Sequence, residues 1–339
     1  MLTQHNPLIP LLLQAEFAQL HFECRMGESV HIDISTILRL RRRLRTAAQE
    51  ILRDREGVFK PLFEPPLSTD PVALKRYQKG APAFVLVPMS IRQGDYRAGE
   101  LFTFEVRLFG NIAELAPGLI EVFAALGKTG LRLDAGKYTL KCVFASDAGE
   151  DRIPVWHESG GNQLHNIPRL DLGWWLGGQP QACDLLELKF ITPARILTHG
   201  RPLFNPDLGQ LFPFVLRRVT AMLYIHCGVE LDPVDFELAY EINGWSCEDN
   251  NLYWYDWRYL HAESGRSKPL GGICGTLRVQ GDVTGPMLSM LQLGSLLNLG
   301  KNAAYGVGAY AIEYMHPESI KQNLFLGEIA YEKNCVGRA

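Results

Sequence analysis

The chain has 339 residues, and at roughly 150 residues per domain this length predicts about two domains. Hydrophobic residues make up 47% of the chain and charged residues 21%, proportions that exclude a disordered, collagenous or coiled-coil protein. The net charge of −3 and the isoelectric point near 6.3 give the protein no overall attraction for a polyanion. Any nucleic-acid binding therefore requires a local concentration of basic residues.

The seven cysteines lie well apart and form no C-x-x-C pair. This spacing predicts neither a zinc site nor a disulfide framework. We therefore expect a protein of the reducing cytoplasm that holds no metal or cofactor. No apolar run approaches the roughly 18 residues that span a bilayer. No Lys or Arg precedes Arg25, although a secretory signal begins with positive charge. We therefore expect a cytoplasmic protein.

The first part of the chain predicts a β-α-β-β-α-β order. Residues 11–25 alternate loosely between apolar and polar side chains, as a strand does. Apolar residues at helical spacing follow from Ile37 to Ile51, with Asp33 or Ser35 as the N-cap. The remaining elements are expected to be strands at 83–87 and 101–109, a helix from about 115 to 126 that ends at Gly127, and a strand at 138–144.

The same order returns after residues 148–184, which are rich in Gly, Pro, Asn, Gln and Trp and predict a connection between domains. The expected elements are strands at 186–191, 235–242, 273–280 and 307–314, a helix at 210–226 that ends at Gly228, and a helix from Pro286 to about 297. The pattern predicts an α+β protein with two tandem ferredoxin-like (RRM-like) domains. We assign the N-terminal domain to residues 8–147, the connection to 148–184, the C-terminal domain to 185–316 and a tail to 317–339.

Residues 298–308, which we call the glycine-rich loop, follow the last predicted helix. Their spacing does not match a Walker A loop or a dinucleotide fingerprint. The glycines permit positive φ angles and let a phosphate approach backbone N–H groups, and a lysine adds charge. On spacing alone, an ordinary glycine-rich turn is the alternative. The candidate phosphate-contacting residues are Gly300, Lys301, Gly306 and Gly308.

The first predicted helix concentrates the basic charge that the net balance conceals. Five arginines lie within seven residues, and no acidic residue occurs between 34 and 49. Such charges repel one another, and a polyanion relieves the repulsion. A solvated charged face is the alternative. The five are Arg39, Arg41, Arg42, Arg43 and Arg45, of which Arg39, Arg42 and Arg43 share the face opposite the apolar stripe.

The glycine-rich loop and the residues after it read G-K-x-x-x-Y-G-x-G-x-Y and close the second ferredoxin-like unit. This segment resembles the glycine-rich loop of the Cas-six family, the pre-crRNA processing endoribonucleases of the CRISPR RAMP superfamily. The resemblance covers most of residues 50–314, and the loop is its most specific part. Further segments that resemble the family are 62–66, 83–86, 104–110, 190–195, the helix with Arg217 and Arg218, and 254–275.

The resemblance implies cleavage of CRISPR repeat RNA without metal, by attack of a ribose 2′-OH on the adjacent phosphate to give a 2′,3′-cyclic phosphate and a 5′-OH. Such chemistry needs a base, an acid and a cation. Histidine suits the proton transfers. His31, just before the arginine-bearing helix, is the first candidate for the base, and His21 in the first strand is the second. His199 and His261 in predicted loops are weaker candidates.

Aromatic residues alternate with basic ones after residue 254, a pattern that can stack and hold unpaired bases. A core-facing hairpin is the alternative for the tryptophans. Arg258, Arg266 and Lys268 are the candidate RNA contacts in this stretch.

The sequence departs from its relatives at Asn298, where many carry histidine, and at residues 46–62, which lack their cysteine cluster. Two other classes of protein therefore stay open. One is a catalytically inactive RAMP subunit that holds crRNA in a CRISPR effector complex. The other is a small-molecule enzyme on a duplicated ferredoxin-like fold, for which no catalytic constellation is evident.

Overall fold

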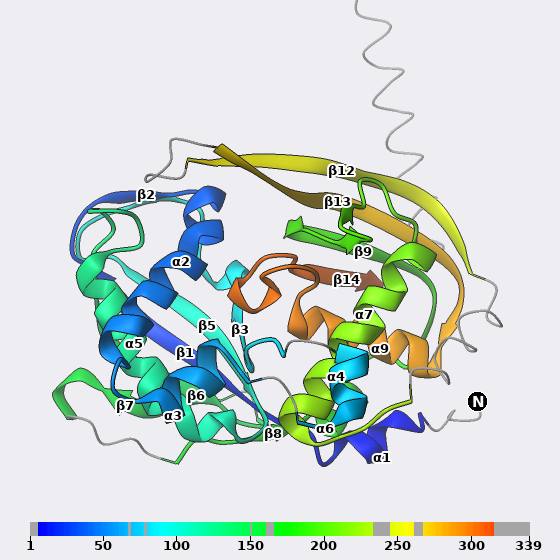
Figure 1. Ribbon diagram of the computed structural model, residues 1–339, viewed down its shortest axis with the longest axis horizontal. Helices are drawn as coiled ribbons and strands as arrows, with labels where there is room; N and C mark the ends of the chain where they lie inside the picture. The colour runs from blue at the N-terminus through cyan, green and yellow to red at the C-terminus, as the bar shows by residue number, and fades with distance from the viewer. Residues whose placement is uncertain are drawn as a thin grey trace, which may run out of the picture.

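The computed structural model describes residues 6–66, 69–77, 80–149, 151–160, 166–232, 245–260 and 267–314. Two antiparallel sheets lie side by side, each with two long helices packed on one face (Figure 1). The glycine-rich loop lies in the middle of the view, between the two halves.

The first sheet has the strand order β3-β5-β1-β6-β7, and each neighbouring pair is antiparallel. Its strands are β1 (Glu16–Met26), β3 (Phe84–Val87), β5 (Leu101–Phe109), β6 (Tyr138–Ser146) and β7 (Arg152–His157), and the short β8 (Leu170–Asp171) also pairs with β1. Two helices, α2 (Ile34–Ile51) and α5 (Ala116–Thr129), supply the apolar side chains that pack on one face.

The second sheet has the order β12-β13-β9-β14, again antiparallel throughout. Its strands are β9 (Ala182–Ala194), β12 (Ser246–Leu260), β13 (Ser267–Thr284) and β14 (Tyr310–Tyr314). The helices α7 (Leu208–Met222) and α9 (Gly285–Leu297) pack on one face.

Both sheets therefore place the first and third strands of a β-α-β-β-α-β unit at the centre and the second and fourth outside them. This arrangement is that of the ferredoxin-like fold. The prediction of an α+β protein with two tandem ferredoxin-like units is confirmed.

Shorter elements decorate the two units. The strands β2 (Val30–Ile32) and β4 (Gly94–Tyr96) form one small ribbon, and β10 (Leu197–Thr198) and β11 (Arg201–Pro202) form another. The remaining helices are α1 (Leu8–Leu12), α3 (Glu56–Phe63), α4 (Pro71–Tyr77) and α6 (Leu172–Gly177), with 3-10 turns at Pro88–Ser90, Gly110–Leu115, Glu158–Gly160 and Ala303–Tyr305 and a π turn at Leu223–Cys227.

Three predicted elements need correction. The apolar run before Glu16 belongs to helix α1 and a turn, because a short apolar run has no periodicity that separates helix from strand. Helix α5 continues through Gly127 to Thr129, and Gly127 is explained by close packing rather than by a helix end, because Tyr138 lies where its Cβ would be. The aromatic stretch before residue 260 is strand β12, which occupies the second-strand position. The strand predicted at 235–242 lies outside the described residues.

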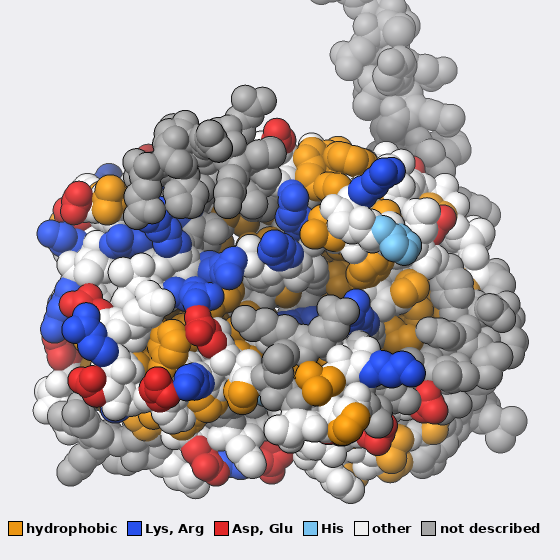
Figure 2. All heavy atoms as spheres, viewed as in Figure 1, with side chains coloured by type: hydrophobic (Ala, Val, Ile, Leu, Met, Phe, Trp, Pro, Cys, Tyr) orange, Lys and Arg blue, Asp and Glu red, His pale blue; other side chains and the backbone are white. Residues whose placement is uncertain are grey.

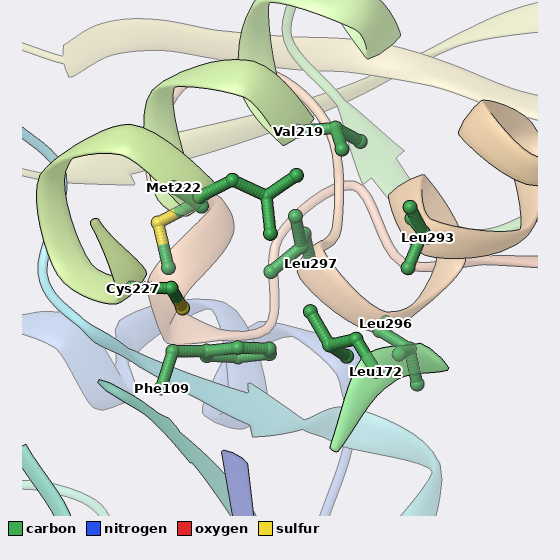
Figure 3. A pocket seen from close by; sticks show the side chains of 9 residues that line it. Phe109, Leu172, Val219, Met222, Cys227, Leu293, Leu296 and Leu297 are labelled. Atoms are coloured by element: carbon green, nitrogen blue, oxygen red, sulfur yellow. The ribbon is translucent and has the colours of Figure 1, made fainter. Parts of the chain in front are cut away.

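Each half has an apolar core, and the two cores exchange residues at the junction. Phe17 and Phe109 of the first sheet belong to the core of the second half, whereas Tyr305 of the glycine-rich loop belongs to the core of the first. A small cavity at the junction has an apolar lining that includes Phe109, Leu172 of α6 and side chains of α7 and α9 (Figure 3). The two halves are therefore joined by apolar packing around the glycine-rich loop.

Candidate functional site

The glycines of the glycine-rich loop let the chain pass close to its own backbone. Gly300 has φ 90°, and a Cβ there would lie 2.6 Å from the carbonyl oxygen of Arg195. Gly308 has φ 71°, and a Cβ there would collide with the carbonyl of Leu299. Two of the glycines singled out in the sequence are thus explained by tight turns of the loop itself.

Hydrogen bonds hold the loop in one shape. The N–H of Leu299 donates to the carbonyl of Gly308 at 2.8 Å, which closes the loop at its base. The N–H of Lys301 donates to the carbonyl of Arg195 at 2.9 Å, and the hydroxyl of Thr192 donates to the carbonyl of Gly306 at 2.7 Å. The loop is therefore tied to strand β9 and the residues after it, with the Lys301 side chain exposed.

Asn298, the first residue of the glycine-rich loop, has a structural role. Only 3% of this residue is exposed, and its φ is 55°. Its amide nitrogen donates to the carbonyl of Leu86 in β3 at 3.2 Å and to the carbonyl of Ala303 at 3.0 Å. An asparagine tolerates this left-handed conformation and bridges the loop to the first sheet.

Two partly buried arginines hold the end of helix α9, where the loop begins. Arg107 of β5 donates to the carbonyl of Leu296 at 3.2 Å, and Arg218 of α7 donates to the carbonyl of Leu297 at 3.1 Å. Burial lowers the pKa of Arg218 to about 10, so the guanidinium still carries its charge near neutral pH. Positive charge at a helix C-terminus offsets the partial negative charge of the unpaired carbonyls.

The middle of helix α2 meets the glycine-rich loop at Tyr305. The guanidinium carbon of Arg41 lies 5.8 Å from the centre of the Tyr305 ring, within range of a cation–π contact. Arg45, one turn further, forms an ion pair with Glu64. Burial raises the pKa of the Tyr305 hydroxyl to about 12, and the charges of Arg45 and Arg41 act in the opposite direction. This contact brings a cation of the first half onto the loop of the second.

The other arginines of α2 have different surroundings. Arg43 donates to the carbonyls of Thr129 (2.6 Å) and Gly130 (3.0 Å) at the end of α5, so it supports the packing of the two helices. Arg39 and Arg42 lie on the exposed side of α2. Lys and Arg side chains gather over α2 and continue across the centre of this face (Figure 2). The basic surface predicted from the sequence therefore borders the loop.

His31 lies in β2, before the N-cap of α2. Its Nδ1 is 2.8 Å from the carboxylate of Asp95, and 58% of the histidine side chain is exposed. The cap itself is Asp33, whose pKa burial alone would raise, whereas hydrogen bonds from Thr36 and Ser35 lower it to about 2. At 1.5 Å per helical residue, His31 lies roughly 10 Å or more along the axis from Arg41.

His21 lies in the middle of β1 with 4% of its surface exposed. Its Nε2 is 2.8 Å from the hydroxyl of Ser146. Burial lowers the pKa of His21, and the charges of Arg152 and Arg107 act in the same direction, while Glu105 opposes them. Among the described residues, no hydrogen bond or ion pair joins His21 or His31 to the glycine-rich loop.

The structure gives partial information on the candidates of the β12–β13 hairpin. The backbones of Arg258 and Lys268 are paired in the ladder, where Arg258 faces Pro269 and Lys268 faces Tyr259. Their side chains, Arg266 and His261 lie outside the described part of the chain.

Two different family models match the two halves of the chain. Residues 39–168 match a family model described only as an N-terminal domain. Residues 188–310, which include the whole glycine-rich loop, match the model of the CRISPR-associated endoribonuclease Cas6. Over these residues the chain resembles the Cas6 family. No curated protein matches the chain.

Solved structures of Cas6 proteins have a similar fold. A chain of a partial Cas6-RT-Cas1–Cas2 complex is 15% identical with a TM-score of 0.52, and the match covers 89% of this chain and 47% of that one. A second chain, from a Cas6-RT-Cas1–Cas2 complex, has the same identity and TM-score, and 29% of it is covered. This protein thus spans less than half the length of those two chains. Cas6 of Thermus thermophilus is 13% identical with a TM-score of 0.47, and 88% of this chain and 99% of that chain are covered.

The contacts of four residues around the loop were not predicted from the sequence: those of Arg41, Asn298, Arg107 and Arg218. A signal existed only for Arg41, since Arg41 and Arg45 are four residues apart and share a face of α2. The other three act on carbonyls of distant segments, and no local pattern marks such contacts. None of the described helices is both long enough and apolar enough to cross a bilayer.

Proposed function

We propose that this protein binds CRISPR repeat RNA and cleaves precursor crRNA without a metal ion. The observation that carries the proposal is the contact of Arg41 on helix α2 with Tyr305 of the Cas6-family glycine-rich loop. It joins a basic helix from one half to a lysine-bearing loop from the other. RNA lying across this junction meets positive charge from both sides, as a phosphate backbone requires.

In the proposed reaction a ribose 2′-oxygen attacks the adjacent phosphorus. The new P–O2′ bond forms while the P–O5′ bond breaks, which yields a 2′,3′-cyclic phosphate and a 5′-OH. A base takes the 2′-OH proton, and an acid gives a proton to the departing 5′-oxygen. Arg41 and Lys301 are suited to stabilise the charge that accumulates on the pentavalent phosphate.

His31 is the proposed base. A hydrogen bond from its Nδ1–H to Asp95 orients the ring and leaves Nε2 to accept a proton. Its distance from Arg41 along α2 requires RNA to run along the helix from the glycine-rich loop. His21 is the second candidate: its lowered pKa favours the neutral form, but its burial leaves little room for RNA.

Labelled repeat RNA, transcribed from the CRISPR array nearest the gene and incubated with the protein in EDTA, tests the proposal. We expect cleavage to a product with a 2′,3′-cyclic phosphate and binding that weakens steeply with salt. His31→Ala should abolish cleavage and leave binding nearly intact. Binding without a cyclic-phosphate product would sink the nuclease proposal, and full activity of His31→Ala would exclude that residue as the base.

A second candidate function is that of a catalytically inactive RAMP-type subunit that holds crRNA with other proteins of a CRISPR effector complex. The buried, hydrogen-bonded Asn298 at the position of the relatives' histidine favours it. An amide is not a general base, and neither His21 nor His31 is bonded to the loop within the described structure. Tight binding of repeat RNA without any cleavage would support this role.

A further inference from the structure

An exposed phenylalanine lies in the segment that follows strand β11. Phe204, two residues after β11, is 58% exposed, although its neighbour Leu203 packs against the core of the second half. The N–H of Leu203 donates to the carbonyl of Ile196 at 3.1 Å and anchors the segment. The backbone therefore holds a large apolar ring at the surface, where it gains little from burial.

The Phe204 ring packs on the side chain of Trp254, which itself packs on strand β13. The ring centres of Phe204 and Trp254 are 4.7 Å apart, and the planes are tilted by 55°. The indole lies over β13 at Gly271, where a Cβ would collide with the ring. Because this glycine leaves room for the indole, Trp254 is held rigidly and supports Phe204 as part of an aromatic platform.

Basic residues connect this platform to the glycine-rich loop. Arg195 donates from Nη1 to the carbonyl of Gly271 at 3.3 Å, and its own carbonyl accepts from the N–H of Lys301 at 2.9 Å. Arg201, in β11, is exposed three residues before Phe204. Arg195 thus links the position of β13 on which Trp254 packs to the backbone of the glycine-rich loop at Lys301.

We propose that Phe204 and Trp254 form a stacking subsite for an unpaired nucleobase of the RNA whose backbone passes Lys301. The flanking positive charge favours an RNA strand over an apolar protein segment as the occupant, since aromatic rings beside basic side chains bind single strands by stacking and charge together. The inference rests on the proposed function in that RNA must lie at the glycine-rich loop.

The test uses two fluorescein-labelled probes of equal length, an oligouridylate and an RNA backbone without bases. Phe204→Ala should weaken oligouridylate binding about tenfold, because a stacked base is lost, and should leave binding of the abasic probe unchanged. Phe204→Tyr should restore the affinity. The control is Tyr253→Ala, which removes a ring that is 56% exposed on the opposite face of β12 and should change neither affinity.

Three results would overturn the subsite. The first is a Phe204→Ala variant that binds the oligouridylate as tightly as the wild type does, and the second is a variant that loses equal affinity for both probes. The third is a wild type that binds the oligouridylate no more tightly than the abasic probe. Thermal unfolding of each variant identifies a loss caused by misfolding, and Phe204→Leu then tests the aromatic ring at nearly constant burial. If the wild type does not cleave repeat RNA but Phe204→Ala weakens only oligouridylate binding, the nuclease proposal alone is contradicted. Normal cleavage with an unaffected Phe204→Ala would contradict the subsite alone.

Discussion

At the scale of residues, the partners of each arginine on α2 determine its role. Arg43 supports the end of α5 through two carbonyls, and Arg45 is neutralised by Glu64 at the end of α3. Arg41 instead contacts the ring of Tyr305, an uncharged partner that leaves its positive charge available to a phosphate. The same residue type on one helix thus contributes packing, charge pairing and a candidate catalytic cation.

Replacement of Arg41 tests the last of these roles. Arg41→Ala should lower the single-turnover cleavage rate about 100-fold, because a cation facing the developing phosphate charge is lost. Arg41→Lys should recover part of the rate, since the charge returns without the planar guanidinium. Arg55→Ala, which removes an exposed arginine paired with Glu121, is the matched control and should cleave normally. An undiminished rate for Arg41→Ala would remove Arg41 from the mechanism.

At the scale of elements, the glycine-rich loop is a closed turn held at both ends. Arg107 and Arg218 bind the last carbonyls of α9, and the Leu299–Gly308 hydrogen bond closes the base of the loop. Such a loop keeps its shape before RNA arrives, and preorganisation lowers the entropy lost on binding. The positive φ of Gly308 and its contact with the Leu299 carbonyl make that glycine irreplaceable on steric grounds.

Gly308→Ala should therefore destabilise the protein more than a glycine replacement where only φ is unfavourable. Gly99 has φ 86° but no atom within 4 Å of an added Cβ, so Gly99→Ala measures the φ term alone, about 1–2 kcal/mol. The collision at Gly308 should add about 1–3 kcal/mol. Urea unfolding of both variants measures the difference in the free energy of unfolding. Equal losses would mean that the collision is relieved by a small shift of the loop.

At the scale of the whole molecule, packing between the halves fixes the relation of α2 to the loop. His226, in the π turn after α7, lies at this junction and hydrogen-bonds through Nε2 to the carbonyl of Ala81 at 2.8 Å. Its own carbonyl lies where a Cβ of Gly110 would stand. Burial lowers the pKa of His226 to about 4, the Ala81 carbonyl raises it and the charge of Arg218 lowers it further.

This histidine makes the folded protein sensitive to acid. Because its pKa is lower in the folded state than the ordinary value near 6.5, its contribution to stability is complete above about pH 6.5 and is lost as the pH falls towards 4. The loss should be on the order of 3 kcal/mol. His226→Gln keeps an N–H donor without a titrating group, so its melting temperature should fall less between about pH 7 and pH 4. Parallel melting curves of the two proteins would contradict this assignment.

The elements with regular periodicity were predictable from the sequence, because their apolar spacing records one buried face. Helices α2, α7 and α9 and strands β3, β5 and β6 lie close to their predicted ranges, and Asp33 is the predicted cap, whereas β7 and β8 lie in the segment predicted as a connection. For the aromatic stretch a hairpin was only an alternative, and its place as the second strand of the sheet was not predicted, because that place depends on pairing with β13 over 14 residue pairs. Its position in the sheet depends on long-range pairing.

The sequence alone determined the duplicated β-α-β-β-α-β order, the concentration of arginine on one helix and the existence of a glycine-rich loop, because each is a local pattern along the chain. Tertiary structure decided which arginine meets Tyr305, that Asn298 reaches Leu86, and that Phe204 packs on Trp254. These partners are 50 to more than 250 positions apart in sequence. The first two contacts depend on how the two halves pack against each other, and the third depends on how a loop of the second half packs on strand β12; no local spacing records either property.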